Sequence, residues 1–419
     1  MNPRGRSRRR FFHRRRRASG YMRRQPKKQL KQTFPPQPAV EESKISKAVP
    51  KVPKRQVLLC PGPVTLSQHV RNALSTQEIC HREPEFAHLL QTVRAKLLHA
   101  LGLNGRYTAV LFSGSGTAAM EAAVLSSLDA GRKLLVVNNG VYGSRIAQLA
   151  RIHQLPLTEI RSPLTEWPDL TRIAAVLKRD SEIGTVALVH HETSTGMLNP
   201  IDGVAALVKK YRRRFLVDAI SSLGAERLDL PKLNVGICVG SAGKCFHGAP
   251  GLSFVLLSQE EASRVLKLKP RSLYLDLGTS LKTQEAGDPL FTPAVPLFWA
   301  FHAALDELIK EGLRLRIARY RQRTSFLRAG FKKLGFKFFL EDKVLSNTLT
   351  ALWVPRGLTY QQLHDRLKKA GFVIYAGQSE LQGKIFRVAH MGQLLQSDLK
   401  DLLKILKEIL EQTNLAVPR

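Results

Sequence analysis

Cysteine is scarce in this 419-residue chain, and long apolar runs are missing from it. The four cysteines, Cys60, Cys80, Cys238 and Cys245, include no CxxC pair and have no histidine at metal-ligand spacing. Neither a disulfide framework nor a zinc site is therefore expected, and a reducing, cytoplasmic location fits this cysteine usage. No apolar segment approaches the roughly 18 residues that a membrane span requires, so we expect no membrane association.

Acidic residues are also in short supply, with 33 Asp and Glu against 66 Lys and Arg. Residues 1–55 hold 19 of the basic residues and two of the acidic ones. This segment has no hydrophobic periodicity, so the sequence predicts a disordered basic tail and linker over residues 1–56. An arginine-rich arm of this kind can contact nucleic acid through salt-sensitive phosphate contacts, or act as a transit peptide, or be only a solvated extension.

The rest of the chain has the composition of a large globular protein. Hydrophobic residues make up 43% of the sequence, enough for a sizeable core. Short apolar runs at 108–112, 134–137, 185–189 and 215–217 alternate with helical patterns at 118–128 and 143–152. Continuously apolar strands separated by helices are typical of a mostly parallel sheet covered on both faces, which is an α/β fold. We expect this large domain to span residues 57–315.

A different pattern follows a long helical region at about 295–334. Predicted strands at 336–340, 347–354, 372–375 and 385–390 are interspersed with helices near 359–370 and 396–411. This pattern predicts a smaller α+β domain over residues 316–419.

The turns after the predicted strands form the candidate site, because ligands bind at the carboxyl ends of parallel strands. The first turn, SGSGTAAM, matches GxGxxA, but the next strand ends in Asn138-Asn139 rather than in the acidic residue that a dinucleotide site requires. What remains is a glycine-rich turn that offers backbone N–H groups and the hydroxyls of Ser115 and Thr117 to a phosphate. On its own, such a turn is equally typical of a purely structural tight turn.

The segment GSAGKCFHGAPG places one lysine, Lys244, among small and apolar residues after the apolar run 235–239. Asp218 ends the preceding strand, where an acid is as often a helix N-cap. Together with the phosphate turn, these residues supply what pyridoxal phosphate requires: an anion cradle, a carboxylate for the pyridine nitrogen and a primary amine that binds the cofactor covalently.

Seven motifs in chain order carry a family resemblance: LLCPGPVTLSQHV, SGSGTAAMEA, NNGVYGSR, HHETSTGMLNPID, FLVDAISSLG, SAGKCFHGAPG and FRVAHMG. From about Leu58 to the C-terminus, the chain resembles the class V aminotransferases of fold type I, most closely the 2-aminoethylphosphonate–pyruvate branch. The resemblance implies a pyridoxal-phosphate enzyme and a homodimer.

The resemblance also implies roles for individual residues. Lys244 would bind the cofactor and move the proton during catalysis, and Asp218 would pair with its ring nitrogen. Tyr142 would stack on the ring, and Thr193 would bind its phenolic oxygen. The phosphate would be held by Ser115, Gly116 and Thr117, with Thr292 reaching in from the other subunit. Arg387 would bind the acidic end of the substrate, and Arg82 is a second candidate cation there.

Two positions depart from the family pattern. Gly243 stands where the family usually has Asn or Gln before the lysine, and Pro289 stands where an aromatic neighbour of Thr292 is often found. The expected reaction is transamination of 2-aminoethylphosphonate with pyruvate, giving phosphonoacetaldehyde and alanine in phosphonate degradation. The alternatives are an alanine–glyoxylate or serine–pyruvate aminotransferase, or a nucleic-acid-binding protein that acts through its basic tail.

Overall fold

The computed structural model describes residues 56–413, which belong to one compact unit. The predicted basic tail and its nucleic-acid contact lie outside the described residues, apart from the last position of the linker. Within residues 56–413, no helix has both the length and the apolar character that crossing a bilayer requires.

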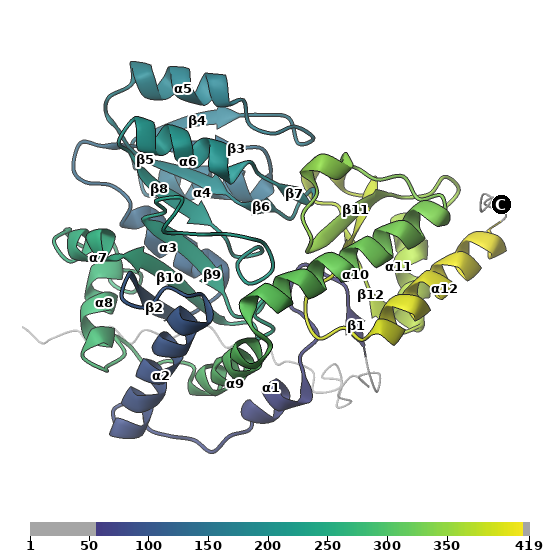
Figure 1. Cartoon of the computed structure of the whole chain (residues 1–419), viewed down its shortest axis with the longest axis horizontal. Helices are drawn as coiled ribbons and strands as arrows, with labels where there is room; N and C mark the ends of the chain where they lie inside the picture. Colours follow the sequence, from purple (N-terminus) through teal and green to yellow (C-terminus); the bar gives the residue numbers. More distant parts are fainter. Residues whose placement is uncertain (1–55, 414–419) are drawn as a thin grey trace, which may run out of the picture. The chain divides into compact units, whose positions relative to one another are not determined.

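A seven-stranded sheet forms the centre of the unit (Figure 1). Its strands, in spatial order, are β2 (Tyr107–Ser113), β10 (Leu252–Ser258), β9 (Ile237–Ser241), β8 (Arg214–Asp218), β5 (Ile183–Val189), β3 (Lys133–Asn138) and β4 (Leu157–Arg161). Strand β10 runs antiparallel to both of its neighbours, and the strands from β9 to β4 are all parallel. The expected mostly parallel α/β fold is confirmed.

Helices cover both faces of this sheet, as the continuously apolar strands require. One face packs against α2 (Pro84–Ala100), α5 (Leu170–Arg179), α6 (Ile201–Lys210) and α9 (Val295–Glu311), and α1 (Gln68–Ala73) packs on α9. The other face packs against α3 (Gly116–Leu125), α4 (Val141–Ile152), α7 (Gln259–Val265) and α8 (Leu277–Glu285).

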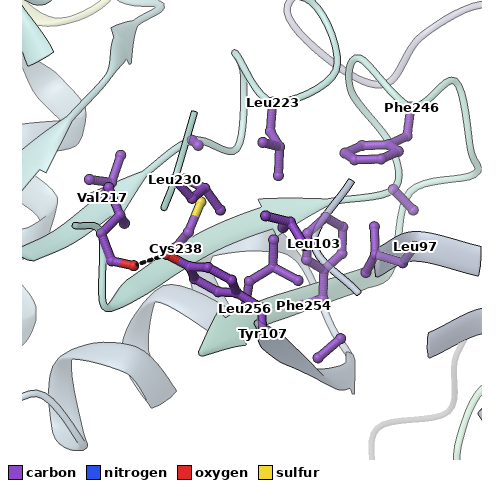
Figure 2. Close-up of a cluster of buried hydrophobic side chains, with 14 of the residues drawn as sticks. Leu97, Leu103, Tyr107, Val217, Leu223, Leu230, Cys238, Phe246, Phe254 and Leu256 are labelled. Carbon is purple, nitrogen blue, oxygen red and sulfur yellow. Dashed lines mark hydrogen bonds between the residues drawn. The ribbon is translucent and has the colours of Figure 1, made fainter. Parts of the chain in front are cut away.

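Aromatic rings fill the core on the α9 side of the sheet. Phe246 meets Phe254 edge to face at 5.4 Å between ring centroids, and Figure 2 shows both beside Leu97 and Leu256. The hydroxyl of Tyr107 donates to the backbone carbonyl of Val235 at 2.6 Å, which satisfies its one polar atom. This packing fixes β9 and β10 and hence the turn that follows β9.

The C-terminal part carries its own sheet and hydrophobic core. The three-stranded sheet has the order β11 (Leu349–Trp353), β14 (Ile385–Ala389) and β13 (Tyr375–Ala376), and β1 (Val57–Leu58) pairs with β12 (Phe372–Val373). Three helices, α10 (Leu313–Lys333), α11 (Tyr360–Lys369) and α12 (Gln396–Gln412), complete this part. A short pair, β6 (His191–Glu192) and β7 (Met197–Leu198), lies outside both sheets.

Two details of the C-terminal part differ from the sequence-based expectations. The predicted strand at 336–340 forms only one bridge, from Phe338 to Leu352, and Phe336 packs into the core against Phe331 and Phe386. The predicted strand at 372–375 is divided into β12 and β13, which join different sheets. The expected boundary at 315/316 falls in the first turn of α10, and the division into two domains stays a prediction.

Candidate active site

Six of the residues singled out from the sequence line one cavity of about 150 Å³ at the carboxyl ends of the parallel strands: Ser115, Gly116, Thr117, Tyr142, Asp218 and Lys244. They come from the turns after β2, β3, β8 and β9. These strands belong to one sheet, although the first and the last of the four turns are more than 100 residues apart in sequence. The arrangement is the one expected where neighbouring parallel strands end at a single edge.

Lys244 follows β9 in a turn and is half-buried. Its Nζ donates to the backbone carbonyl of Pro61, in the segment that precedes α1. The next residue, Gly62, has φ +106°, and a Cβ added there would lie 2.5 Å from the same Nζ. The positive φ favours glycine here, and a Cβ would displace the flexible end of the Lys244 side chain, so Gly62 leaves room for the amine at the Pro61 carbonyl.

Asp218 ends β8 and is 6% exposed. Its Oδ1 accepts a hydrogen bond from the backbone N–H of Ile220 at 3.0 Å, and it forms no ion pair with any residue of 56–413. The helix N-cap alternative is wrong, because turns rather than a helix follow this strand. Burial raises the pKa of Asp218 to about 7. A cationic ligand group beside this carboxyl would favour its ionised form.

Thr193 carries a buried hydroxyl without a partner. The residue is 1% exposed, and no hydrogen bond forms at its Oγ1 within the described chain. Buried hydroxyls are almost always satisfied, so a buried hydroxyl without a partner favours a ligand atom as its acceptor or donor. The two residues before Thr193, His191 and Glu192, form β6, and His191 lines the cavity.

The phosphate-binding candidates lie at the N-terminus of α3. Ser115 is the N-cap residue, yet its hydroxyl makes no capping hydrogen bond and is exposed. Arg145 donates from Nη1 to Thr117 Oγ1 at 3.3 Å, and its guanidinium carbon lies 4.7 Å from the ring centroid of Tyr142. The helix N-terminus and this guanidinium both favour an anion.

Arg387 lies in the middle of β14 and is 2% exposed. Its Nε donates to the carbonyl of Ala376 at 2.9 Å, and Nη1 donates to the carbonyl of Thr193 at 2.9 Å and to Gln378 Oε1 at 3.2 Å. No carboxylate of residues 56–413 forms an ion pair with it, and none of their atoms accepts a hydrogen bond from Nη2. Burial lowers its pKa.

Arg387 and Lys244 approach the same segment from two directions. Cys60 precedes the Pro61 carbonyl that Lys244 contacts, and the positive charges of Lys244 and Arg387 both act to lower the pKa of its thiol. Burial outweighs them and raises the pKa of Cys60 overall. The amine and the guanidinium therefore flank one stretch of chain, Cys60–Gly62.

Four predicted residues do not line this cavity: Thr193 and Arg387, described above, and Thr292 and Arg82. Thr292 is exposed, and its Oγ1 is 3.5 Å from His81 Nε2. Arg82 is also exposed and directly precedes the Glu83 N-cap of α2, so this segment is a solvated helix start. Within a single chain, neither residue joins Lys244 and Arg387, and their assigned roles stay predictions.

The departure at Gly243 has a steric reason. A Cβ at this position would lie 2.8 Å from the Cα of Pro250, so the backbone of the following turn occupies the space that a side chain needs. The chain therefore has no side-chain donor at Gly243. Arg145 is the cation that stands beside the phosphate turn instead.

Sequence reasoning missed Glu192, which organises the start of α4. Its Oε2 accepts from the backbone N–H groups of Tyr142 and Gly143 at 3.0 and 3.2 Å, and its Oε1 accepts from the hydroxyl of Ser194 at 2.6 Å. Burial raises the pKa of this carboxyl, while these hydrogen bonds lower it. An acid inside the otherwise uncharged ETSTG segment is the signal that could have identified it.

Pyridoxal phosphate fits these groups. The α3 N-terminus with Ser115 suits its phosphate, the Asp218 carboxyl suits a protonated ring nitrogen, and the orphan Thr193 hydroxyl suits its phenolic oxygen. Tyr142 lines the cavity between the phosphate turn and Asp218, where a ring would lie against it. Lys244 supplies the primary amine.

Known proteins share this architecture and sequence. A family model described as Aminotransferase class-V matches residues 65–397. The 2-aminoethylphosphonate–pyruvate transaminase of Klebsiella pneumoniae is 36% identical over 355 residues, which cover 84% of this chain and 96% of that protein. A Thermus thermophilus aspartate aminotransferase of subgroup IV has a TM-score of 0.78 at 29% identity, covering 85% of this chain and 99% of its own.

A third similar protein is the alanine–glyoxylate aminotransferase of a Nostoc species, with a TM-score of 0.81 and 25% identity. The alignment covers 89% of this chain and all of that one. The matches extend over both sheets, and the cavity at their carboxyl edge has the polar groups that pyridoxal phosphate needs. This chain therefore belongs to the class V aminotransferases, which are pyridoxal-phosphate enzymes of fold type I.

Proposed function

We propose that this aminotransferase transfers the amino group of 2-aminoethylphosphonate to pyruvate, giving phosphonoacetaldehyde and alanine in phosphonate degradation. The observation that carries the proposal is Arg387, a buried guanidinium with no carboxylate partner within residues 56–413 and an Nη2 without an acceptor. An uncompensated buried charge is costly unless a ligand neutralises it. The similarity to a protein named for this reaction supports the same substrate.

A phosphonate suits this cation better than a neutral group does. It carries close to two negative charges near neutral pH, and each charge-assisted hydrogen bond contributes about 1.5–3 kcal/mol. One such bond discriminates by roughly tenfold or more against a substrate that lacks it. Arg387 would therefore select the acidic end of the donor and orient its amine toward Lys244.

The chain's own residues would then handle the proton. Bound pyridoxal phosphate supplies the electron sink for the reaction. Lys244 Nζ would remove the proton from the substrate carbon that bears the amine and return it in the second half-reaction. The Asp218 carboxylate would stabilise a protonated ring nitrogen, and the Thr193 hydroxyl would hold the phenolic oxygen. Ser115, Gly116 and Thr117 would bind the phosphate.

The same proposal includes a cytoplasmic homodimer. Thr292 is exposed and does not line the cavity around Lys244 in its own chain, which suits a residue that completes the site of a second copy. If so, each active site uses residues of two chains, and a monomer has little activity. Sedimentation of the active enzyme would test this, and full activity from a verified monomer would contradict it.

Kinetics with purified enzyme test the substrate. We expect kcat/KM with pyruvate as acceptor to be at least about a hundredfold higher for 2-aminoethylphosphonate than for serine as donor, since two charge-assisted hydrogen bonds are at stake. Alanine and pyruvate only exchange into one another, so alanine is compared with 2-aminoethylphosphonate with glyoxylate as the acceptor, and the same difference is expected. Comparable or higher values for the two amino acids would instead assign the chain to the alanine–glyoxylate or serine–pyruvate enzymes.

A further inference from the structure

Gln378 is a side chain that contacts Arg387 and that the proposed reaction does not use. It follows β13 and precedes a short 3-10 helix, Ser379–Leu381. The backbone on either side is fixed, because Gly377 N–H donates to the Ile385 carbonyl at 2.9 Å and Leu381 N–H donates to the Gln378 carbonyl at 3.0 Å. The position of residue 378 is therefore set by its backbone.

The Gln378 side chain itself is held by a single hydrogen bond. Its Oε1 accepts from Arg387 Nη1 at 3.2 Å, and its Nε2 donates to no group of residues 56–413. The oxygen must be the atom that faces Arg387, because a guanidinium has donors only. This bond is the longest of the three that Arg387 makes, and it is the only one whose acceptor is a side chain.

The hydrogen-bond count at Arg387 limits what it can offer an anion. Two of the five N–H groups donate to the backbone carbonyls of Ala376 and Thr193, and a third donates to Gln378. Only the two N–H groups of Nη2 have no acceptor within the described chain. A bidentate contact through Nη1 and Nη2, the usual geometry for carboxylate or phosphonate, requires Gln378 Oε1 to leave Nη1.

Gln378 also borders the space from which a substrate could arrive. It lines a cavity of about 630 Å³ together with Ser194 and Arg145, and Arg387 does not line that cavity. Arg145 lines both this cavity and the smaller one around Lys244. Gln378 therefore lies between the larger cavity and the buried guanidinium, and its side chain has room to turn.

We propose that Gln378 is a specificity-determining residue that distinguishes tetrahedral three-oxygen anions from carboxylates, an inference that rests on the proposed function. Its side-chain oxygen satisfies Arg387 Nη1 until a substrate binds. The anion then takes Nη1 and Nη2 with two oxygens, and the Gln378 amide turns so that Nε2 donates to the third oxygen. A carboxylate has only two oxygens, so it gains the Arg387 contact without the contact to Gln378.

Non-reacting anions test this reading without turnover. Ethylphosphonate, ethanesulfonate and propionate carry the same two-carbon chain, and their dissociation constants can be measured by calorimetry on the cofactor-loaded enzyme. In Gln378→Ala, we expect phosphonate and sulfonate to bind roughly tenfold or more weakly, the loss of one charge-assisted hydrogen bond. Propionate should change by less than about threefold. The sulfonate has three oxygens but only one negative charge, so it distinguishes the effect of the third oxygen from the effect of the second charge of the phosphonate.

Two further variants complete the experiment. Gln378→Glu puts a carboxylate against Arg387 and should weaken all three anions, because it pairs with the guanidinium they need. Gln382→Ala is the matched control, since Gln382 is an exposed glutamine of the same loop with no side-chain hydrogen bond to residues 56–413. It should leave all three constants unchanged.

The outcomes also separate this inference from the proposed function. Equal losses for the three anions in Gln378→Ala, or no loss for any, would overturn the role of Gln378 even if 2-aminoethylphosphonate proves to be the donor. A wild-type enzyme without activity on 2-aminoethylphosphonate would refute the proposed function. The dissociation constants of the three anions would still show whether Gln378 distinguishes three-oxygen anions from carboxylates.

Discussion

The edge of the seven-stranded sheet and the middle of the three-stranded sheet hold buried groups of opposite charge. The first holds the carboxyl of Asp218 and the second holds the guanidinium of Arg387, and neither group forms an ion pair within residues 56–413. Each group is costly alone, and a direct pair would relieve both. The fold keeps them apart. In the proposed roles, Asp218 binds the cofactor ring and Arg387 binds the substrate anion, so stability would be given up where ligands bind.

The two regions also differ in how their groups are positioned. Asp218 and Lys244 lie where strands of one sheet end, so a local pattern determines their place. Arg387 depends on carbonyl groups of Ala376 and Thr193, which belong to separate segments. We therefore expect that substitutions around Arg387 can change substrate binding without loss of the cofactor.

Removing the amine should have the largest effect on the cofactor side. Lys244→Ala should fold, because the side chain is only half-buried, but lose activity by at least about a thousandfold through loss of the proton-transferring group. Borohydride reduction followed by peptide mapping should label Lys244 in the wild type and nothing in the variant. Lys232→Ala, in a surface turn, is the control. Cofactor found on another lysine would refute the assignment.

Changing the guanidinium tests mainly the substrate side, although it also removes the hydrogen bond to the carbonyl of Thr193, whose hydroxyl is proposed to bind the cofactor. Arg387→Ala should lower kcat/KM for 2-aminoethylphosphonate by about a hundredfold or more, whereas the affinity for pyridoxal phosphate should stay within about threefold. Arg387→Lys should recover little, since a lysine cannot reproduce the fork of hydrogen bonds. If Arg387→Ala weakened cofactor and substrate equally, the distinction between the two regions would fail.

Acid should weaken the contact between the two regions. His191 binds Ser346 and Thr348 at 2.8 Å each, and burial lowers the pKa of His191 to about 3. In the unfolded chain the imidazole takes up a proton near pH 6.5, whereas in the folded chain it stays neutral down to a much lower pH. The contribution of neutral His191 to the free energy of unfolding is therefore present above pH 6.5 and is lost as the pH falls. From pH 7 to pH 5 the loss is about 2 kcal/mol in the free energy of unfolding.

Denaturant unfolding at several pH values measures this effect. His191→Gln should remove its share of the pH dependence, whereas substitution of the exposed His99 by Gln should not. Unchanged pH dependence in His191→Gln would show that the neutral imidazole does not join the two regions. His390, whose pKa burial also lowers to about 3, should add a similar contribution.

The smallest effect is expected from the basic segment. Deleting residues 1–55 should change kcat and KM by less than about twofold, because both charged regions are built from later residues, while any retention on nucleic acid should disappear. Steady-state kinetics and a salt-dependent binding assay with the two proteins measure this. A large fall in kcat would show that the segment takes part in the active site.

Local patterns explain which features were predictable. The apolar strands and the turns after them identified the α/β fold and the Lys244–Asp218 cavity, because strand ends of one parallel sheet must meet at an edge. The antiparallel β10 was not foreseen, since a buried strand has the same apolar pattern in either direction. Gly62 could not be identified because its contact with Lys244 joins segments far apart in sequence, and Gln378 could not because a single loop glutamine carries no motif that indicates a contact with Arg387.

The pairing of β1 with β12 also determines when the active site can form during synthesis. Val57 pairs with Phe372, and the Leu59 carbonyl accepts from Ala389 N–H, so the segment that brings Pro61 to Lys244 is anchored by residues more than 300 positions later. A nascent chain still on the ribosome has the complete seven-stranded sheet after about residue 258, yet it lacks the anchor. Productive cofactor capture is thereby deferred until nearly the whole polypeptide has emerged.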